Sequence, residues 1–85
     1  MNTENASHNK RVLVVEDDPS IVELLSIHLE DMGFQVESEG DGDLGLAKAL
    51  ADSFELIILD VMLPGMDGME VCKRIRMEDR VTPIM

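Results

Sequence analysis

Two short apolar runs stand out along the sequence, and both are typical of strands buried on both faces of a parallel sheet. Residues 12–15 (VLVV) and 56–59 (LIIL) contain no polar side chain. Residues 34–39 (FQVESE) instead alternate apolar and polar side chains, as an outer strand of the same sheet would. The predicted strands cover residues 11–16, 34–39 and 56–60, and a further strand starts at 82–85 (TPIM).

Apolar residues recur at helical spacing between these strands. In the first such segment Asp18 is placed as an N-cap, Pro19 occupies the first helical position, and Gly33 stops the helix. Pro-Gly and Asp-Gly breakers make residues 61–68 a loop before the last helix. The predicted helices run from Pro19 to just before Gly33, over residues 44–51, and over residues 69–77.

This alternation of strands and helices predicts an α/β fold with a doubly wound parallel sheet and right-handed crossovers. The length of 85 residues allows one domain. Residues 1–9 are polar and lack periodicity, so we expect a disordered tail there and the folded domain in residues 10–85.

Composition narrows the class of protein further. Eighteen acidic against seven basic residues give a net charge of -11, which argues against a nucleic-acid-binding surface. The single cysteine, Cys72, leaves no internal disulfide and fits a reducing compartment. Apolar runs of four residues are too short for a membrane span or a signal-peptide core. We therefore predict a soluble, cytoplasmic, acidic chain.

Carboxylates follow both buried strands. Glu16 and Asp17 come after the first, and Asp60 closes the second. In a doubly wound sheet, ligands bind beyond the carboxyl ends of the strands at the point where strand order reverses. If these strands are neighbours, about 4.8 Å apart, the carboxylates meet in one small volume. Two such carboxylates repel each other by roughly 4 kcal/mol at about 4 Å and an effective dielectric constant of about 20, so protons or a cation must neutralise the cluster. Oxygen ligands favour Mg²⁺ or Mn²⁺.

Simpler interpretations exist for part of this cluster. Asp18 is explained by its position as a helix cap, and Glu16 and Asp17 could equally be solvated residues at a strand end. Asp60 is harder to explain in this way, because it closes a strand that is otherwise apolar. An aspartate in a metal-binding acidic pocket is able to attack a phosphoryl group.

Residues 40–45 (GDGDLG) match the formal dinucleotide-binding pattern G-x-G-x-x-G after a strand and before a helix. Asp41 and Asp43, however, would face a pyrophosphate with the wrong charge, and the preceding strand is half polar. An acidic turn at residues 40–43 is the better interpretation.

The strings VLVVEDDPSIVELL (residues 12–25) and ELIILDVMLPGMDGMEVCKRIR (residues 55–76) resemble the receiver domain of two-component response regulators. The resemblance extends over residues 10–85 and is strongest to receivers joined to winged-helix, DNA-binding domains of transcriptional regulators. It implies a flavodoxin-like sheet and a phosphoacceptor signalling domain rather than an enzyme, with at most self-phosphorylation from small phosphodonors and autodephosphorylation.

By the same resemblance, Asp60 is the aspartate phosphorylated by a histidine kinase. Asp17 would bind Mg²⁺ directly, Glu16 through water, and Met62 through its backbone carbonyl. Asp60 itself completes this metal site.

Family members continue past the fourth strand to a Thr or Ser, a further helix, a lysine-bearing fifth strand and a final helix. The resemblance therefore implies a receiver truncated within its fourth strand, with impaired switching. An alternative from a different class is a structural fragment that self-associates through its exposed sheet, as a domain-swapped or face-packed homo-oligomer.

Overall fold

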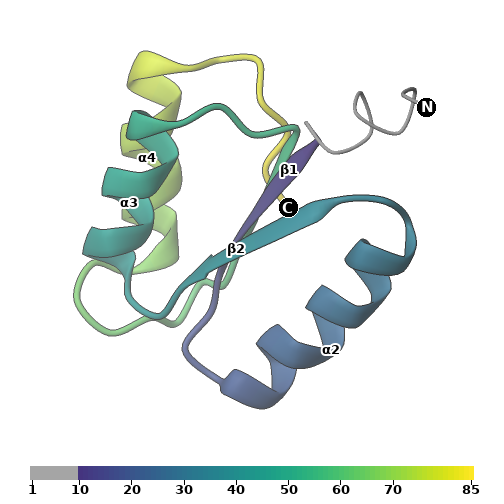
Figure 1. The fold of residues 1–85 in the computed structure, drawn as a ribbon. Coiled ribbons are helices and arrows are strands. Elements are labelled where there is room, and N and C mark those ends of the chain that lie inside the picture. Colours follow the sequence, from purple (N-terminus) through teal and green to yellow (C-terminus); the bar gives the residue numbers. More distant parts are fainter. Residues whose placement is uncertain (1–9) are drawn as a thin grey trace.

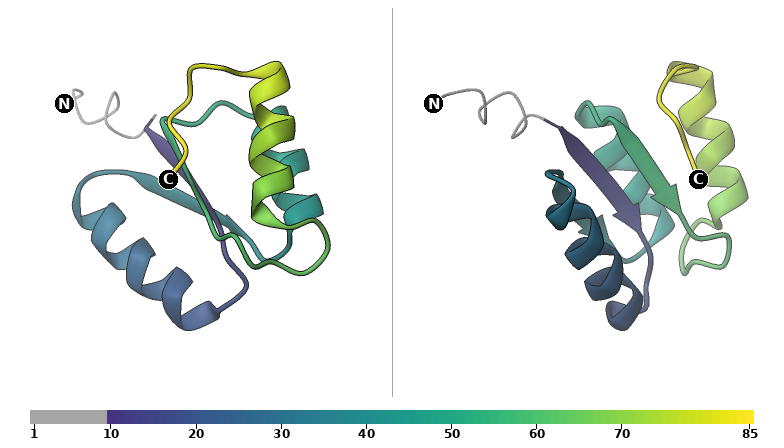
Figure 2. Two further views of the ribbon diagram at one scale, coloured as in Figure 1. Left: turned by 180° about the vertical axis from the view of Figure 1, so that it is seen from behind. Right: turned by 90° about the vertical axis from the view of Figure 1, so that its right-hand side faces the viewer.

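A parallel sheet with the strand order β2-β1-β3 forms the centre of the computed structural model, which describes residues 10–85. The predicted tail, residues 1–9, lies outside the described residues. Helix α2 covers one face of the sheet, and α3 and α4 lie side by side on the other (Figures 1 and 2). The elements are β1 (Arg11–Val15), α2 (Pro19–Asp31), β2 (Gln35–Glu39), α3 (Gly42–Ala51), β3 (Leu56–Leu59) and α4 (Gly68–Glu78).

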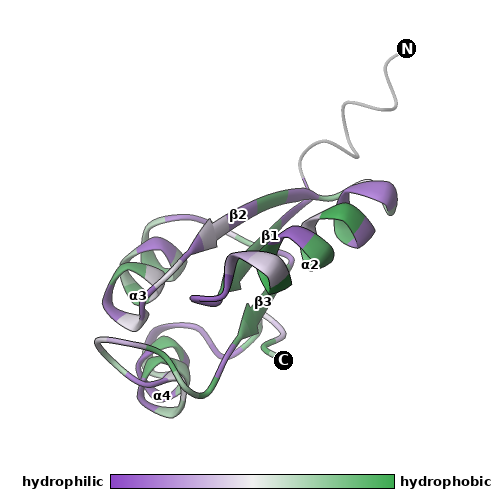
Figure 3. Ribbon diagram, turned by 90° about the horizontal axis from the view of Figure 1, so that it is seen from below, coloured by the Kyte–Doolittle hydropathy of each residue, from purple (hydrophilic) through white to green (hydrophobic). Residues whose placement is uncertain are grey.

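The central strand β1 explains the first apolar run. Val12 and Val14 pack towards α2, whereas Leu13 and Val15 pack towards α3 and α4, and none of the four is exposed. A strand covered on both faces needs apolar residues at every position. Figure 3 shows that β3 is also hydrophobic along its length. Strand β2, at the edge of the sheet, instead alternates hydrophobic and polar residues. The prediction of a doubly wound, flavodoxin-like parallel sheet is confirmed, since the order β2-β1-β3 matches that topology.

Side-chain caps fix where the helices begin. Asp18 accepts the Ser20 N–H at 2.9 Å, which confirms it as the cap of α2, and Gly33 follows that helix with φ 97°. Helix α3, however, begins at Gly42 rather than at the predicted Leu44, because Asp41 caps it by accepting the Leu44 N–H at 2.8 Å. The predicted turn at residues 40–43 is therefore half helical.

The predicted fourth strand is reduced to an isolated bridge between Ile57 and Ile84. The Ile57 N–H donates to the Pro83 carbonyl at 2.9 Å, and the Met85 N–H donates to the Ile57 carbonyl at 2.9 Å. Pairing is confined to residues 83–85, and Pro83 has no N–H to offer a ladder, so no regular strand forms there. Within residues 10–85, no helix has the length and apolar character needed to cross a membrane.

A network of ion pairs joins β1, β2 and α3 away from the carboxyl ends of the strands. Glu37 on β2 accepts hydrogen bonds from Arg11 and lies 2.9 Å from the Lys48 Nζ atom. Asp52 lies near both cations, and the Arg11 guanidinium stacks over Phe54 at 4.9 Å from its ring centre. Lys48 and Arg11 hold the pKa of Glu37 below its ordinary value of 4.5.

We predict that Glu37→Gln lowers stability at neutral pH but not in acid. A carboxyl whose pKa is lowered by folding stabilises the fold above its unfolded pKa, near 4.5, and loses that contribution as pH falls through the folded value. Urea unfolding followed by far-ultraviolet circular dichroism should show a lower midpoint for the variant at pH 7, with the two midpoints converging below pH 4.5. Glu55→Gln, an exposed carboxylate outside this network, is the control. A difference between wild type and Glu37→Gln that is constant with pH would contradict the ion-pair account.

Candidate phosphoacceptor and metal site

The pairing of β1 with β3 brings the acidic residues together. Val15 is the register partner of Leu59, so the two strands end at the same level. The backbone continues this alignment one residue further: the Asp60 N–H donates to the Val15 carbonyl at 3.0 Å, and the Glu16 N–H donates to the Glu39 carbonyl at 3.0 Å. The side chains that follow β1 and β3 therefore lie together at the carboxyl end of the sheet.

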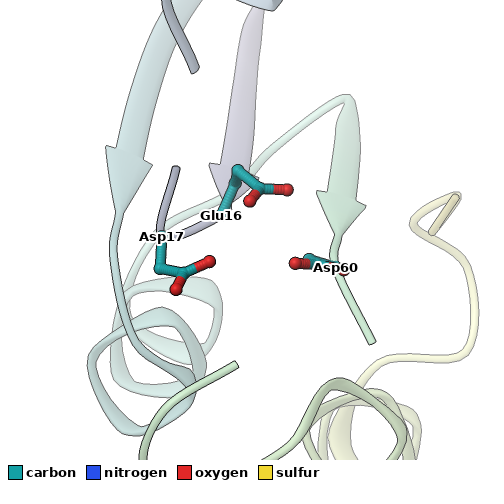
Figure 4. Close-up of side chains that lie close together, drawn as sticks. All are labelled: Glu16, Asp17 and Asp60. Atoms are coloured by element: carbon teal, nitrogen blue, oxygen red, sulfur yellow. The ribbon is translucent and has the colours of Figure 1, made fainter. Parts of the chain in front are cut away.

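Glu16, Asp17 and Asp60 each place one carboxylate oxygen within 4.8 Å of the others, as Figure 4 illustrates. Glu16 and Asp60 are half-buried, and Asp17 is exposed. The carboxylates thus converge as expected, and their role as metal ligands stays a prediction. Asp18 is not part of the cluster, because its side chain caps α2.

Charge repulsion within the cluster is largely unbalanced. Burial raises the pKa of Glu16, and the neighbouring Asp60 and Asp17 carboxylates raise it further, whereas the Asp18 N–H, 3.1 Å from Glu16 Oε2, opposes the change. Among residues 10–85, no ion pair involves these three carboxylates. Hard oxygen donors without a cationic neighbour fit Mg²⁺, or Mn²⁺, better than a nitrogen- or sulfur-binding metal.

The β3–α4 loop, residues 60–67, lies beside the cluster. The Met62 N–H donates to Asp60 Oδ1 at 3.3 Å, and the Gly68 N–H closes the loop by donating to the Val61 carbonyl at 2.9 Å. The side chain of Met62 is 81% exposed, which agrees with a role confined to its backbone. Its carbonyl as a metal ligand remains a prediction.

An open cavity of about 690 Å³ adjoins the cluster. It meets the cluster at Asp17, and its wall is mostly apolar apart from two aspartates. The lining residues are Asp17, Val61, Met62, Leu63, Pro64, Asp67 and Met69. Most of these residues belong to segment 61–68, which the sequence predicts to be a loop.

The structure does not support the dinucleotide-binding alternative. In that motif the backbone N–H groups at the start of the helix bind a pyrophosphate. Here the Gly42 N–H donates to the Pro64 carbonyl at 3.0 Å, and the Asp41 carboxylate occupies the capping position. The glycine-rich segment at the start of α3, residues 40–43, therefore contacts the β3–α4 loop.

The fold and the arrangement of the three carboxylates match the receiver domain that the sequence resembles. The sequence matches the response regulator receiver domain over residues 12–85, and the chain belongs to that family. It is 48% identical over 77 residues to the alkaline phosphatase synthesis transcriptional regulatory protein PhoP of Bacillus subtilis, a match that covers 91% of this chain and 32% of the relative. The chain thus spans about a third of the length of the curated relatives it matches.

Solved structures give the same result. The response regulator TrrA of Thermotoga maritima, in complex with Mg²⁺ and BeF, superposes with a TM-score of 0.84 at 37% identity, covering 88% of this chain and 65% of that chain. TrrA in complex with the histidine kinase ThkA superposes with a TM-score of 0.81 at the same identity and coverage. These structures confirm the flavodoxin-like receiver fold predicted from the sequence.

We predict that Asp17→Asn stabilises the metal-free chain. Removing one charge from the cluster relieves repulsion between exposed carboxylates, so the free energy of unfolding should rise by about 0.2–1 kcal/mol. Asp18→Asn is the matched control, because asparagine keeps the helix cap and removes a neighbouring charge outside the cluster. The measurement is urea unfolding in a chelator at low and high salt, where screening should shrink the gain. An equal rise in the free energy of unfolding of both variants would contradict the view that repulsion within the cluster is specifically relieved.

Proposed function

We propose that the chain is a phosphoacceptor receiver in which Asp60 takes a phosphoryl group from a histidine kinase in an Mg²⁺-dependent reaction. The carboxylates of Glu16, Asp17 and Asp60, together with the backbone carbonyl of Met62, would hold the metal. The observation that carries the proposal is the convergence of three carboxylates at the ends of β1 and β3, with no ion pair to them among residues 10–85.

The geometry supports Asp60 as the nucleophile. A carboxylate oxygen of Asp60 attacks phosphorus, the bond between phosphorus and the histidine nitrogen of the kinase breaks, and that nitrogen takes a proton from solvent. The Met62 N–H orients the Asp60 carboxylate through its Oδ1 atom. Bound Mg²⁺ would supply positive charge that offsets both the carboxylate repulsion and the charge on the phosphoryl oxygens. The open cavity leaves room for the approaching side chain.

The whole protein to which such a domain belongs would be a cytoplasmic transcriptional regulator. PhoP, ResD and RpaA, which the chain resembles at 40–48% identity, are named as transcriptional regulators. With a net charge of -11, these 85 residues are unsuited to contact DNA themselves. Contacts with nucleic acid would belong to another domain.

We expect Asp60→Ala to abolish phosphorylation of the chain. Intact-mass measurement after incubation with acetyl phosphate and Mg²⁺ should show one added phosphoryl group in the wild type and none in the variant or in the presence of a chelator. Asp31→Ala, which removes an exposed carboxylate at the last residue of α2, away from the cluster, should still be modified. Modification that persists in Asp60→Ala would refute the assignment.

Asp17→Asn should weaken Mg²⁺ binding by at least about tenfold, while Asp18→Asn should change it little. The dissociation constant is obtained from the Mg²⁺-dependent amide shifts of Asp60 and Met62. The same Asp17→Asn substitution that stabilises the metal-free fold would thus impair the metal site. Similar losses in both variants would indicate general electrostatic attraction instead of direct ligation.

Self-association is a second candidate function, favoured by large apolar side chains that stay exposed at one end of the chain. Met77, Val81 and Met85 are 75%, 87% and 75% exposed. In this alternative two copies cover each other's apolar surface without signalling. Light scattering tests it: a dimer that is indifferent to Mg²⁺ and acetyl phosphate supports self-association, and a monomer excludes it.

A further inference from the structure

The glycine-rich segment at the start of α3, residues 40–43, contacts the β3–α4 loop at three consecutive residues. The Gly42 N–H donates to the Pro64 carbonyl at 3.0 Å. Gly65, the next loop residue, lies against the Asp43 carboxylate. Met66 follows, with its carbonyl against the Cα atom of Gly42. These contacts join segments that are distant in the sequence.

Only glycine fits at position 42. A Cβ atom there would lie 1.7 Å from the Met66 carbonyl oxygen and 2.6 Å from the carbonyl carbon, and both are backbone atoms that cannot rotate away. Gly42 is also fully buried. At Gly40, two residues earlier, a Cβ atom would meet nothing within 4 Å. The close approach is therefore specific to one glycine of the segment.

The loop residue Gly65 is constrained in a related way. Its φ of 78° lies in the left-handed region that favours glycine. A Cβ atom at this position would lie 2.7 Å from Asp43 Oδ2. The missing side chain of Gly42 thus lets its backbone touch the Met66 carbonyl, and the missing side chain of Gly65 leaves space for the Asp43 carboxylate.

We propose that the first turn of α3, through Gly42 and Asp43, positions the β3–α4 loop so that Met62 is held in place beside Asp60. The proposal rests on the function proposed above. At its other end the loop is tied to the cluster by the bond from the Met62 N–H to Asp60 Oδ1. The hydrogen bond and the closest approach of Gly42 both go to the loop, at Pro64 and Met66, so Gly42 acts through the loop and is a positioning residue.

Two of the three glycines in the G-x-G-x-x-G match have structural roles that involve no nucleotide. Gly42 is required for close approach to Met66. The third glycine of the pattern, Gly45, is required because a Cβ atom would lie 2.6 Å from Val15 Cγ1. Val15 is a side-chain neighbour in the core, so this second contact serves packing of α3 on the sheet and leaves the loop untouched.

The two glycines provide a matched pair of variants. Gly42→Ala should shift the amide signals of residues 62–66 in the metal-free 85-residue chain and weaken Mg²⁺ binding by about tenfold, as loss of a supporting contact to a metal site does. Gly40→Ala should change neither. Gly45→Ala should lower the unfolding midpoint while leaving the amide signals of loop residues 64–66 unchanged. That comparison separates loop positioning from a general loss of stability.

A folded Gly42→Ala chain with wild-type loop signals and wild-type Mg²⁺ affinity would overturn the proposal. If Gly42→Ala does not fold, the Mg²⁺ affinity of Gly65→Ala is compared with that of the double variant Gly65→Ala/Asp43→Ala. The single variant Asp43→Ala is the reference. Removing the Asp43 carboxylate should restore part of the Mg²⁺ affinity that Gly65→Ala loses. Absence of any such coupling would also overturn the proposal.

The metal-free measurement keeps this inference separate from the proposed function. If the wild-type chain fails to bind Mg²⁺ or to accept a phosphoryl group, the proposed function fails. The amide signals and hydrogen exchange of residues 62–66 in Gly42→Ala, compared with Gly40→Ala, still decide whether the first turn of α3 positions the loop.

Discussion

Parallel pairing between β1 and β3 is the interaction on which the site depends. The register that sets Val15 opposite Leu59 ends both strands at one level, and the residues after them share one edge of the sheet. A slip by one residue would turn every side chain of β1 to the opposite face, and it would also move the charged Arg11 or Glu16 into a position now held by a fully buried valine. Burial of one such side chain is worth about 1.5–3 kcal/mol, whereas exposed charge pairs are worth about 0.2–1 kcal/mol. The core therefore tolerates the repulsion at its edge.

The carboxylate cluster and the ion-pair network show two opposite uses of charge in one acidic chain. Glu37 is neutralised by Lys48 and Arg11, and its lowered pKa marks a carboxylate that favours the folded state. Burial raises the pKa of Glu16, and the neighbouring Asp60 and Asp17 carboxylates raise it further, so this carboxylate does not favour the folded state. Local instability of this kind is typical of functional sites, where a ligand supplies the missing interaction.

Features with a local cause were predictable from the sequence, and features with a distant cause were not. The strand runs, the Asp18 cap and the Gly33 stop each depend on neighbouring residues, and the structure confirms them. The start of α3 was predicted two residues late, because residues 40–43 were interpreted as a turn, whereas Asp41 caps a helix that already begins at Gly42. The fourth strand proved to be a single bridge at Ile84. The approach of Gly42 to Met66 had only the glycine itself as a signal, since its partner is known only from the fold.

The most direct test is an amide ¹H–¹⁵N correlation spectrum of the chain without and with Mg²⁺ and beryllofluoride, which mimics a bound phosphoryl group. The chain has no Trp or Tyr, so optical probes of tertiary structure are weak. The account predicts a dispersed spectrum in which the ligand-dependent shifts are concentrated at Glu16, Asp17, Asp60 and Met62. A dispersed spectrum that does not respond to the ligands, or responds equally in Asp60→Ala, would contradict it.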